Sequence, residues 1–250
     1  TINVQRTAAG GIVGGEVGLY VLRFTENTMM PNTFDPDAVF YRPFSISSPS
    51  TITDNADHGS ISAIDVDNDG KAYAVGYVRN QIELNPGNPI QPTTENTSIG
   101  FVLRLNADNQ NTPAPGILDW YKITTNSINA DFTHSVNDVV VDDEHERLFV
   151  VGEYNFDQPF FGSGGQSHMN GFYASLDLNS NNLLEFQKVS SYGDERLSSV
   201  DLSEFKTTVK NSRNHRNIVV GGTFDIVNST HTIQFYNEKG LYGPTYSRSP

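Results

Sequence analysis

The feature that most constrains the fold is an internal repeat. A strand-like run of apolar residues that carries a glycine near its end occurs three times, at Ile61–Val78, Val136–Tyr154 and Asn217–Phe224. The repeat glycines lie at nearly regular intervals and are Gly76, Gly152 and Gly221, with a shorter fourth copy at Gly10–Gly15. A repeat of this kind predicts one small unit per copy. Each unit must stack on its neighbours, because it cannot bury its apolar faces alone.

Two further strand-like runs follow each repeat glycine. The first has alternating or continuous apolar residues, at Gly18–Phe24, Gly100–Leu105, Gly171–Leu178 and His231–Asn237. The second is often aromatic, at 38–46, 118–123, 183–189 and 243–247. The sequence therefore predicts an all-β fold with four repeats of a four-stranded antiparallel blade in one domain. The approximate blades are 1–50, 58–125, 133–191 and 196–250.

The way these units stack is the next question. Radial stacking gives a β-propeller, which leaves only short, protected sheet edges, whereas a flat stack exposes its apolar terminal faces. We therefore predict a β-propeller-like architecture with little helix. Closure of four units into a ring and an arc of a longer molecule both remain open at this point.

Composition excludes several functional classes. The formal net charge is −13, so the chain would repel the phosphates of a nucleic acid, and we expect no such partner. The chain has no cysteine, which excludes disulfide scaffolds, thiol catalysis and cysteine-ligated zinc. No apolar run approaches the length that crosses a bilayer, so we expect no membrane span.

The segment 58–125 carries the runs IDVDNDGKAYAVGYV, IELNPG, GFVLRLNADNQ and LDWYKI. These runs resemble the seven-bladed-propeller-type repeats of large secreted bacterial proteins, many of them surface proteins of type IX secretion systems. The segment 133–190 shares the pattern less fully, and the first and last units share only two strands of it. The resemblance implies a propeller fold without a catalytic signature, in secreted or surface-attached adhesive and scaffold proteins. The polar insert Ile82–Ile99 and the count of four units depart from the family.

The most specific local motif is the acidic run from Asp65 to Gly70. Its alternate carboxylates, Asp65, Asp67 and Asp69, can converge on Ca²⁺ in the manner of the first half of an EF-hand loop. The ligand set is incomplete, since Tyr73 follows where a further ligand is expected. The alternative is a hairpin turn with Gly70 at positive φ and solvated carboxylates. Calcium is the one cofactor that the sequence raises.

Two histidines form a second candidate site. His58 and His134 each lie 18 residues before a repeat glycine, so they are expected at equivalent places at the start of a first strand. In a propeller that strand lines the central channel, where both imidazoles can face a ligand or a metal. The alternative is a hydrogen bond that fixes the crossover between two blades.

Carboxylates and aromatic residues raise a sugar-related function. Asp142–Glu144 and Asp54–Asp57 are carboxylate clusters of the kind that glycosidases use, although acidic turns are ordinary in so acidic a chain. Exposed aromatic side chains in the last strand of each unit can stack on sugars, but we expect them in the core between units. These residues are Tyr41, Trp120, Tyr121 and Phe186.

The function that the sequence favours is presentation of surfaces. We expect a non-enzymatic extracellular or cell-surface module that mediates adhesion or self-assembly, including as a filament subunit. Its partners would be other protein subunits, copies of itself, or glycans. The long segments Asn85–Thr97 and Phe34–Pro49 are candidates for contacts with a neighbour. The alternative is a carbohydrate-binding or glycoside-hydrolysing propeller that uses the channel mouth around His58 and His134.

Overall fold

In the computed structural model of the chain, the structure describes a large part of the sequence. The described residues are 21, 24–26, 29–30, 34–36, 59–79, 82–85, 88–90, 98–106, 118–124, 133–155, 159–160, 169–190, 194–205, 215–224, 231–237, 240–241 and 246–248. Regular structure within these ranges is β-strand, apart from one short 3-10 helix, Asp143–His145. The prediction of an all-β fold is confirmed.

Two of the predicted units are four-stranded antiparallel sheets. Unit 2 consists of β3 (Gly59–Val66), β4 (Ala72–Val78), β7 (Ile99–Leu105) and β8 (Leu118–Ile123), paired in chain order. Unit 3 consists of β9 (His134–Asp142), β10 (Arg147–Tyr154), β11 (Asn170–Asp177) and β12 (Leu183–Ser190), also paired in chain order. The sequence placed all eight strands close to where they lie.

The fourth unit differs from the prediction. β13 (Glu195–Phe205) and β14 (His215–Phe224) form a hairpin, which we call unit 4. β15 (His231–Asn237) was expected beside β14, but it pairs with β12 and extends the sheet of unit 3. β16 (Gly240–Leu241) and β17 (Tyr246–Arg248) both pair with β15. β12 and β14 both present a strand edge, and alternation of side chains identifies a strand without selecting its partner.

Two short hairpins complete the described strands. β1 (Phe24–Glu26) pairs with β2 (Phe34–Pro36), and β5 (Ile82–Asn85) pairs with β6 (Asn88–Ile90) inside the long polar insert. Most of the predicted first unit, including Gly10–Gly15 and 38–46, lies outside the described residues. Val21 is described, and its side chain is buried against unit 2. Among the residues that are described, no helix has the length and hydropathy of a membrane span.

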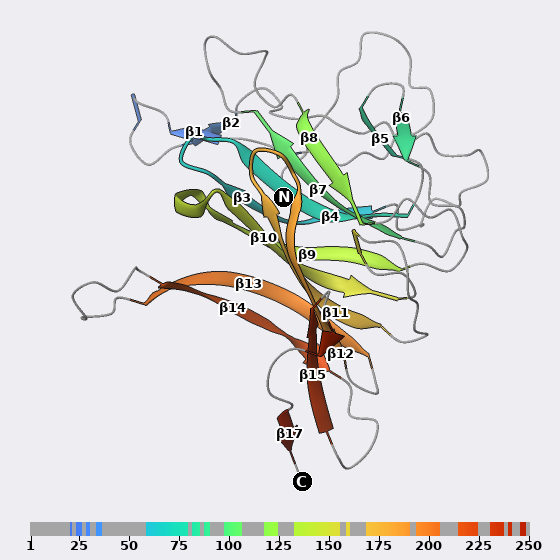
Figure 1. Ribbon diagram of the computed structural model, residues 1–250. Helices are drawn as coiled ribbons and strands as arrows, with labels where there is room; N and C mark the ends of the chain where they lie inside the picture. Colours follow the sequence, from blue (N-terminus) through green and yellow to red (C-terminus); the bar gives the residue numbers. More distant parts are fainter. Residues whose placement is uncertain are drawn as a thin grey trace.

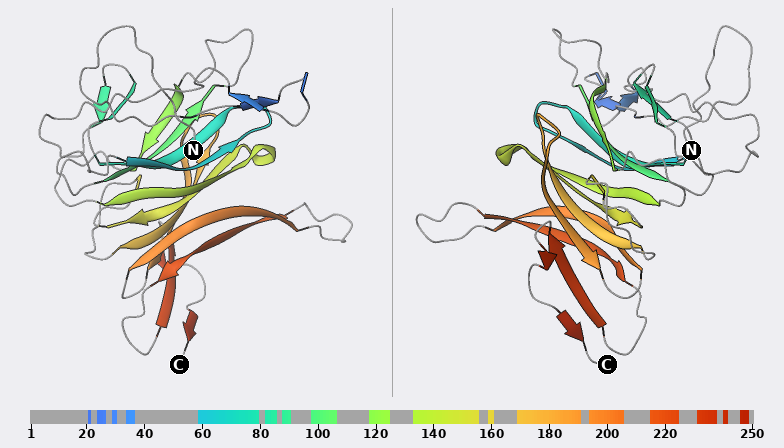
Figure 2. Two further views of the ribbon diagram at one scale, coloured as in Figure 1. Left: turned by 180° about the vertical axis from the view of Figure 1, so that it is seen from behind. Right: turned by 45° about the vertical axis from the view of Figure 1, so that its right-hand side comes forward.

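The three units stack as successive layers in chain order (Figure 1), and two further views show the same layering (Figure 2). β9 of unit 3 packs against β3, β4 and β7 of unit 2. β13 of unit 4 packs against β9, β10 and β11 of unit 3. Each first strand thus lies over the first three strands of the preceding unit, so the two steps of the stack are alike.

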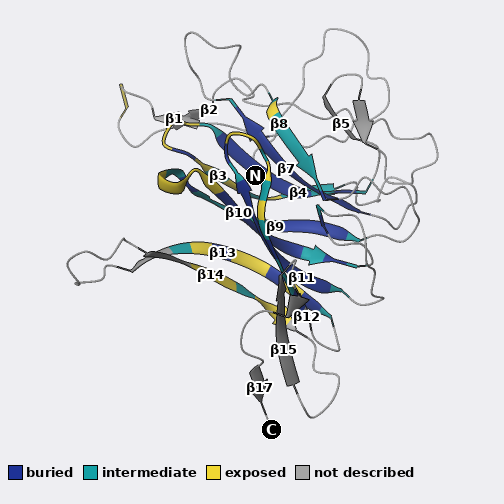
Figure 3. Ribbon diagram, viewed as in Figure 1, coloured by how far each residue is buried: buried dark blue, intermediate teal, exposed yellow. Residues whose placement is uncertain are grey.

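Alternate residues of an inner strand face opposite layers. In β4, Tyr73 and Val75 belong to the cluster between units 2 and 3, whereas Ala72 and Ala74 belong to the cluster on the other face of unit 2. A third cluster lies between units 3 and 4 and contains Phe149, Val151, Tyr173, Val189, Leu197 and Val200. Figure 3 shows burial concentrated in units 2 and 3 and exposure along β13 and β14.

Each unit has a β-bulge in its first strand opposite a glycine in its second. The unpaired bulge residues are Ser62, Asn137 and Ser198. The glycines across from them are Gly76, Gly152 and Gly222, and a Cβ on any of these would overlap the carbonyl oxygen of Ser60, Ser135 or Arg196. The repeat glycine of the last copy is therefore Gly222, and our assignment of Gly221 was wrong by one residue. Two adjacent glycines left the sequence ambiguous, and the strand register resolves it.

Candidate functional site

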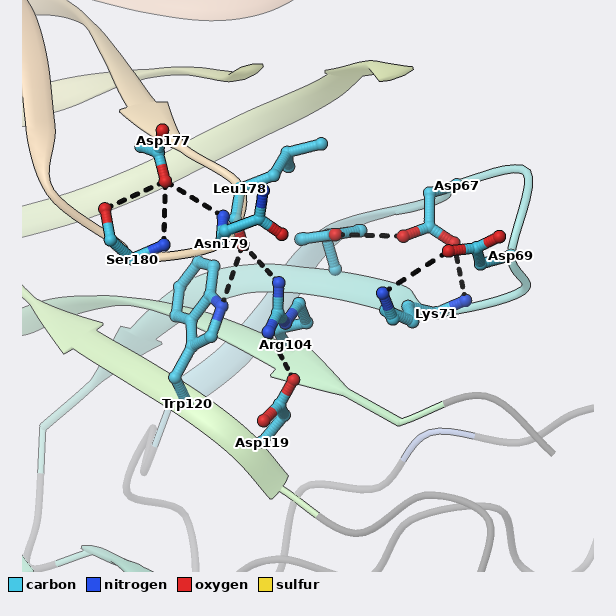
Figure 4. A network of polar contacts seen from close by, with 11 residues as sticks. Asp67, Asp69, Lys71, Arg104, Asp119, Trp120, Asp177, Leu178, Asn179 and Ser180 are labelled. Carbon is cyan, nitrogen blue, oxygen red and sulfur yellow. Dashed lines mark hydrogen bonds and ion pairs between the residues drawn. The ribbon is translucent and has the colours of Figure 1, made fainter. Parts of the chain in front are cut away.

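The acidic run forms the end of β3 and the turn into β4. Asp67 is buried; one of its oxygens accepts a hydrogen bond from Lys71 N at 2.7 Å and the other accepts from Tyr73 Oη at 3.0 Å. The exposed Asp69 lies 3.5 Å from Lys71 Nζ (Figure 4). Gly70 donates to Asp67 O at 3.0 Å and has φ 80°. These contacts give the segment the geometry of a closed hairpin turn.

Asp65 is directed to the next unit instead. Its Oδ2 accepts from Val141 N of β9 at 2.7 Å, and its Oδ1 accepts from Val66 N at 2.8 Å. The structure does not bring Asp65, Asp67 and Asp69 together as a ligand set. Within the described ranges, no group of three or more His, Cys, Asp or Glu side chains is arranged to hold a metal ion. The calcium site stays a prediction.

Two alanine variants test whether this run is a structural turn or a calcium site. We expect Asp67→Ala to lower the free energy of unfolding by about 2 kcal/mol, because the Lys71 amide and the Tyr73 hydroxyl lose a buried acceptor. Asp69→Ala, with an exposed carboxylate, should change it by less than about 1 kcal/mol. Urea unfolding in chelator and in millimolar Ca²⁺ measures both. A calcium-dependent midpoint that Asp67→Ala abolishes would contradict a purely structural turn.

A second aspartate makes the same kind of contact one unit further along. Asp138 Oδ2 accepts from Val200 N of β13 at 2.8 Å, while its Oδ1 accepts from Val139 N at 2.9 Å. Each first strand has one partner within its sheet, so amides on its other edge need acceptors from elsewhere. Asp65 and Asp138 each supply such an acceptor to the following unit.

His134 is buried at the start of β9. Its Nε2 lies 3.1 Å from Asn155 O and its Nδ1 lies 3.1 Å from Thr124 Oγ1. A carbonyl only accepts, so Nε2 carries the proton and Nδ1 accepts from the Thr124 hydroxyl, whose oxygen accepts from Gly100 N at 3.0 Å. Burial lowers the pKa of His134 to about 4, so the ring is neutral at pH 7. The imidazole thus joins unit 2 to unit 3.

His58 is not the counterpart of His134. His134 pairs with Tyr154, which lies two residues after Gly152. The equivalent residue of unit 2 is Val78, two residues after Gly76, and Val78 pairs with Gly59. The β9–β10 hairpin is one residue longer than the β3–β4 hairpin, since Gly152 pairs with Val136 whereas Gly76 pairs with Ile61. Equal offsets from the glycines therefore misaligned the histidines. The predicted equivalence was wrong by one residue. His58 itself lies outside the described residues.

A polar cluster joins β7 and β8 of unit 2 to the turn that follows β11 in unit 3 (Figure 4). Arg104 donates from Nη1 to Leu178 O and pairs through Nη2 with Asp119. Trp120 Nε1 donates to the same Leu178 oxygen at 3.2 Å, and the guanidinium carbon lies 5.5 Å from the centre of the Trp120 ring. Asp177 fixes the turn by accepting from Ser180 N at 2.7 Å.

The aromatic residues of this region pack between sheets. Trp120 and Phe186 contribute to the cluster between units 2 and 3, so the core prediction is confirmed for these two. Tyr121 is partly buried against the opposite face of unit 2. Tyr41 lies outside the described residues. Burial raises the pKa of Tyr73, and its Asp67 partner raises it further. Sequence reasoning missed Arg104, although a lone cation inside the apolar run GFVLRL was a signal for it.

The Arg104 cluster predicts a measurable stability difference. We expect Arg104→Met to lower the free energy of unfolding by about 2 kcal/mol, because Asp119 loses its ion-pair partner and the Leu178 carbonyl loses one of its two donors. Lys71→Met is the matched control, since its ion pair with Asp69 is exposed, and it should cost less than about 1 kcal/mol. Trp120 is the single tryptophan of the chain, so its fluorescence follows the unfolding of this contact. Equal losses in the two variants would contradict the assignment.

Other carboxylates are also engaged within the protein. Asp142 Oδ2 lies 2.9 Å from His145 Nδ1, and Asp143 Oδ2 accepts from Asn68 N at 2.7 Å. Glu153 lies between units 3 and 4, with its Oε2 at 3.2 Å from Arg196 Nε. Burial raises the pKa of Glu153, and Arg196 opposes this shift. The cluster at Asp54–Asp57 lies outside the described residues.

Comparisons with protein-family models, with curated proteins and with solved structures gave no match. Function therefore has to be argued from these contacts.

Proposed function

We propose that the chain is a non-enzymatic extracellular surface module, an adhesive, scaffold or filament-forming subunit built from propeller-type blades. The observation that carries this proposal is that the candidate residues form hydrogen bonds between neighbouring units. Asp65 and His134 each bond from one unit to the next, and Arg104, which the sequence did not single out, adds a third such bond. Polar groups that the sequence offered for catalysis or ligation thereby hold a stack of sheets, whose outer surfaces are left for contacts with partners.

The propeller arrangement is supported by contacts that recur at both steps of the stack. His134 N donates to Ser98 O and Glu195 N donates to Met169 O, each at 3.0 Å and each from the start of a first strand. A glycine of the third strand also sits against the bulge-flanking residue of the next unit, Gly100 against Val136 and Gly171 against Leu197. Repetition of one rotation arranges units in a ring or an arc, as the blades of a propeller are arranged. The recurring contacts therefore favour a propeller arrangement.

One observation supports the alternative of a carbohydrate-binding or glycoside-hydrolysing protein. Glu153 combines burial with a raised pKa, which is the property of a general acid. Its side chain nevertheless contacts Arg196 and also accepts from Ser135 Oγ at 3.3 Å, which fits a structural role. His134 gives the alternative no support, since both of its nitrogens are bonded within the protein.

One pair of assays separates the two functions. Beads coated with the protein should bind one another or a surface that carries glycans, while a panel of chromogenic glycosides should show no hydrolysis. Hydrolysis that Glu153→Gln removes and Glu144→Gln, at an exposed site, retains would overturn the non-enzymatic proposal in favour of the glycosidase. Coated beads that bind neither each other nor any surface would overturn the presentation role directly.

A further inference from the structure

β14 is the counterpart of β4 and β10 but has a different environment. With Gly222 aligned on Gly76 and Gly152, the residues two and three positions before the glycine are 0–3% exposed in β4 and β10. The same positions in β14 are Val220 and Val219, which are 37% and 55% exposed. An apolar strand that belongs in the middle of a sheet is therefore open to solvent among the described residues.

The edge of β14 is open as well. β4 and β10 each have a neighbouring strand on both sides, whereas β14 pairs only with β13 in the part of the chain that the structure describes. β15, which follows β14 in the chain, is paired with β12. From Asn217 to Thr223 the strand has no charged residue and no proline, which are the usual protections of a sheet edge. Such an edge is a template for another strand.

We propose that the edge of β14 pairs antiparallel with β14 of a second copy of the chain. Two hairpins joined in this way make a four-stranded sheet, the strand number of unit 2, and a twofold axis relates them. A pairing centred between Val219 and Val220 places Arg216 opposite the partner's Thr223. The two copies of Arg216 are therefore not placed opposite each other. Ile218 then lies opposite the partner's Gly221. The inference rests on the self-assembly part of the proposed function.

Disulfide trapping tests the register. The chain has no cysteine, so introduced thiols are the only ones present. The double variant Arg216→Cys/Thr223→Cys should give a covalent dimer on mild oxidation. Neither single variant should form a covalent dimer, because the two copies of position 216, or of position 223, are about 23 Å apart in this register. Positions 216 and 223 are equally far apart along one strand, so the two cysteines of one chain cannot bridge each other. A double variant that crosslinks no better than the single variants overturns the pairing.

Sedimentation velocity tests the surface without crosslinking. Over about 1 to 200 µM the wild-type chain should shift from monomer to dimer, and Val219→Lys should raise the dissociation constant at least about tenfold. Leu184→Lys is the control, because Leu184 is 45% exposed on β12 and it should leave the dimer intact. A wild-type monomer throughout, or a dimer that Val219→Lys leaves unchanged, overturns the inference. Coated beads that still bind a glycan-bearing surface would show that the presentation role survives this failure.

Discussion

Replacing Gly152 by alanine should lower the free energy of unfolding by about 3 kcal/mol or more. A Cβ on Gly152 would overlap Ser135 O, which is backbone, and would lie 2.6 Å from Cε1 of Phe172. Phe172 is fully buried between sheets and stacks on Phe186 with ring centroids 5.9 Å apart, so it has no room to retreat. Overpacking against backbone and a buried ring belongs to the most costly class of substitution.

Gly221→Ala provides the matched control for this prediction. The nearest atom to a Cβ there is Ser199 Oγ at 2.7 Å, and a serine hydroxyl can turn away. We expect a change of less than about 1 kcal/mol, measured by urea titration with Trp120 fluorescence. If Gly221→Ala is as damaging as Gly152→Ala, or if Gly152→Ala is harmless, the bulge-and-glycine element is not what fixes these sheets.

Acidification should destabilise the protein through His134. The pKa of His134 is about 4 in the folded state, below its ordinary value of 6.5, so the unfolded chain takes up the proton first. The stabilising effect of the neutral ring is complete above pH 6.5. It is lost progressively as the pH falls toward 4, and the total loss is about 3 kcal/mol.

A glutamine variant isolates this effect from other titrating groups. His134→Gln should be less stable at pH 7, but the part of the pH slope between 6.5 and 4 that belongs to His134 should be absent. His145→Gln, at an exposed histidine, should retain that part. Urea titrations at several pH values give the slopes for all three proteins. A slope in His134→Gln equal to that of the wild type would contradict the buried, neutral imidazole.

The sequence predicted the strands of units 2 and 3 because their apolar positions and glycines recur. It misplaced Gly222 and the counterpart of His134, because a one-residue difference in hairpin length or a doubled glycine shifts an alignment by one residue. Such shifts are visible only in the hydrogen-bond register. It also assigned β15 to β14, since strand patterning does not encode which open edge a strand joins.

The candidate sites were harder to predict than the strands. The acidic run and His134 were identified, but the roles of Asp65 and His134 depend on contacts with residues of another unit, such as the bond from Val141 N to Asp65. Residue types alone do not distinguish a carboxylate that accepts a backbone amide from one that binds calcium. Arg104 was missed because its acceptor, Leu178 O, belongs to a different unit.

One packing step relates each unit to the next. Spin labels at the bulge positions measure it directly, in the double variants Ser62→Cys/Asn137→Cys and Asn137→Cys/Ser198→Cys. Both pairs share the Asn137 site, so the label at that site is the same in the two measurements. If the two steps are alike, the label-to-label distance is the same for the two pairs. Distances that differ by more than the width of the label distribution would contradict it.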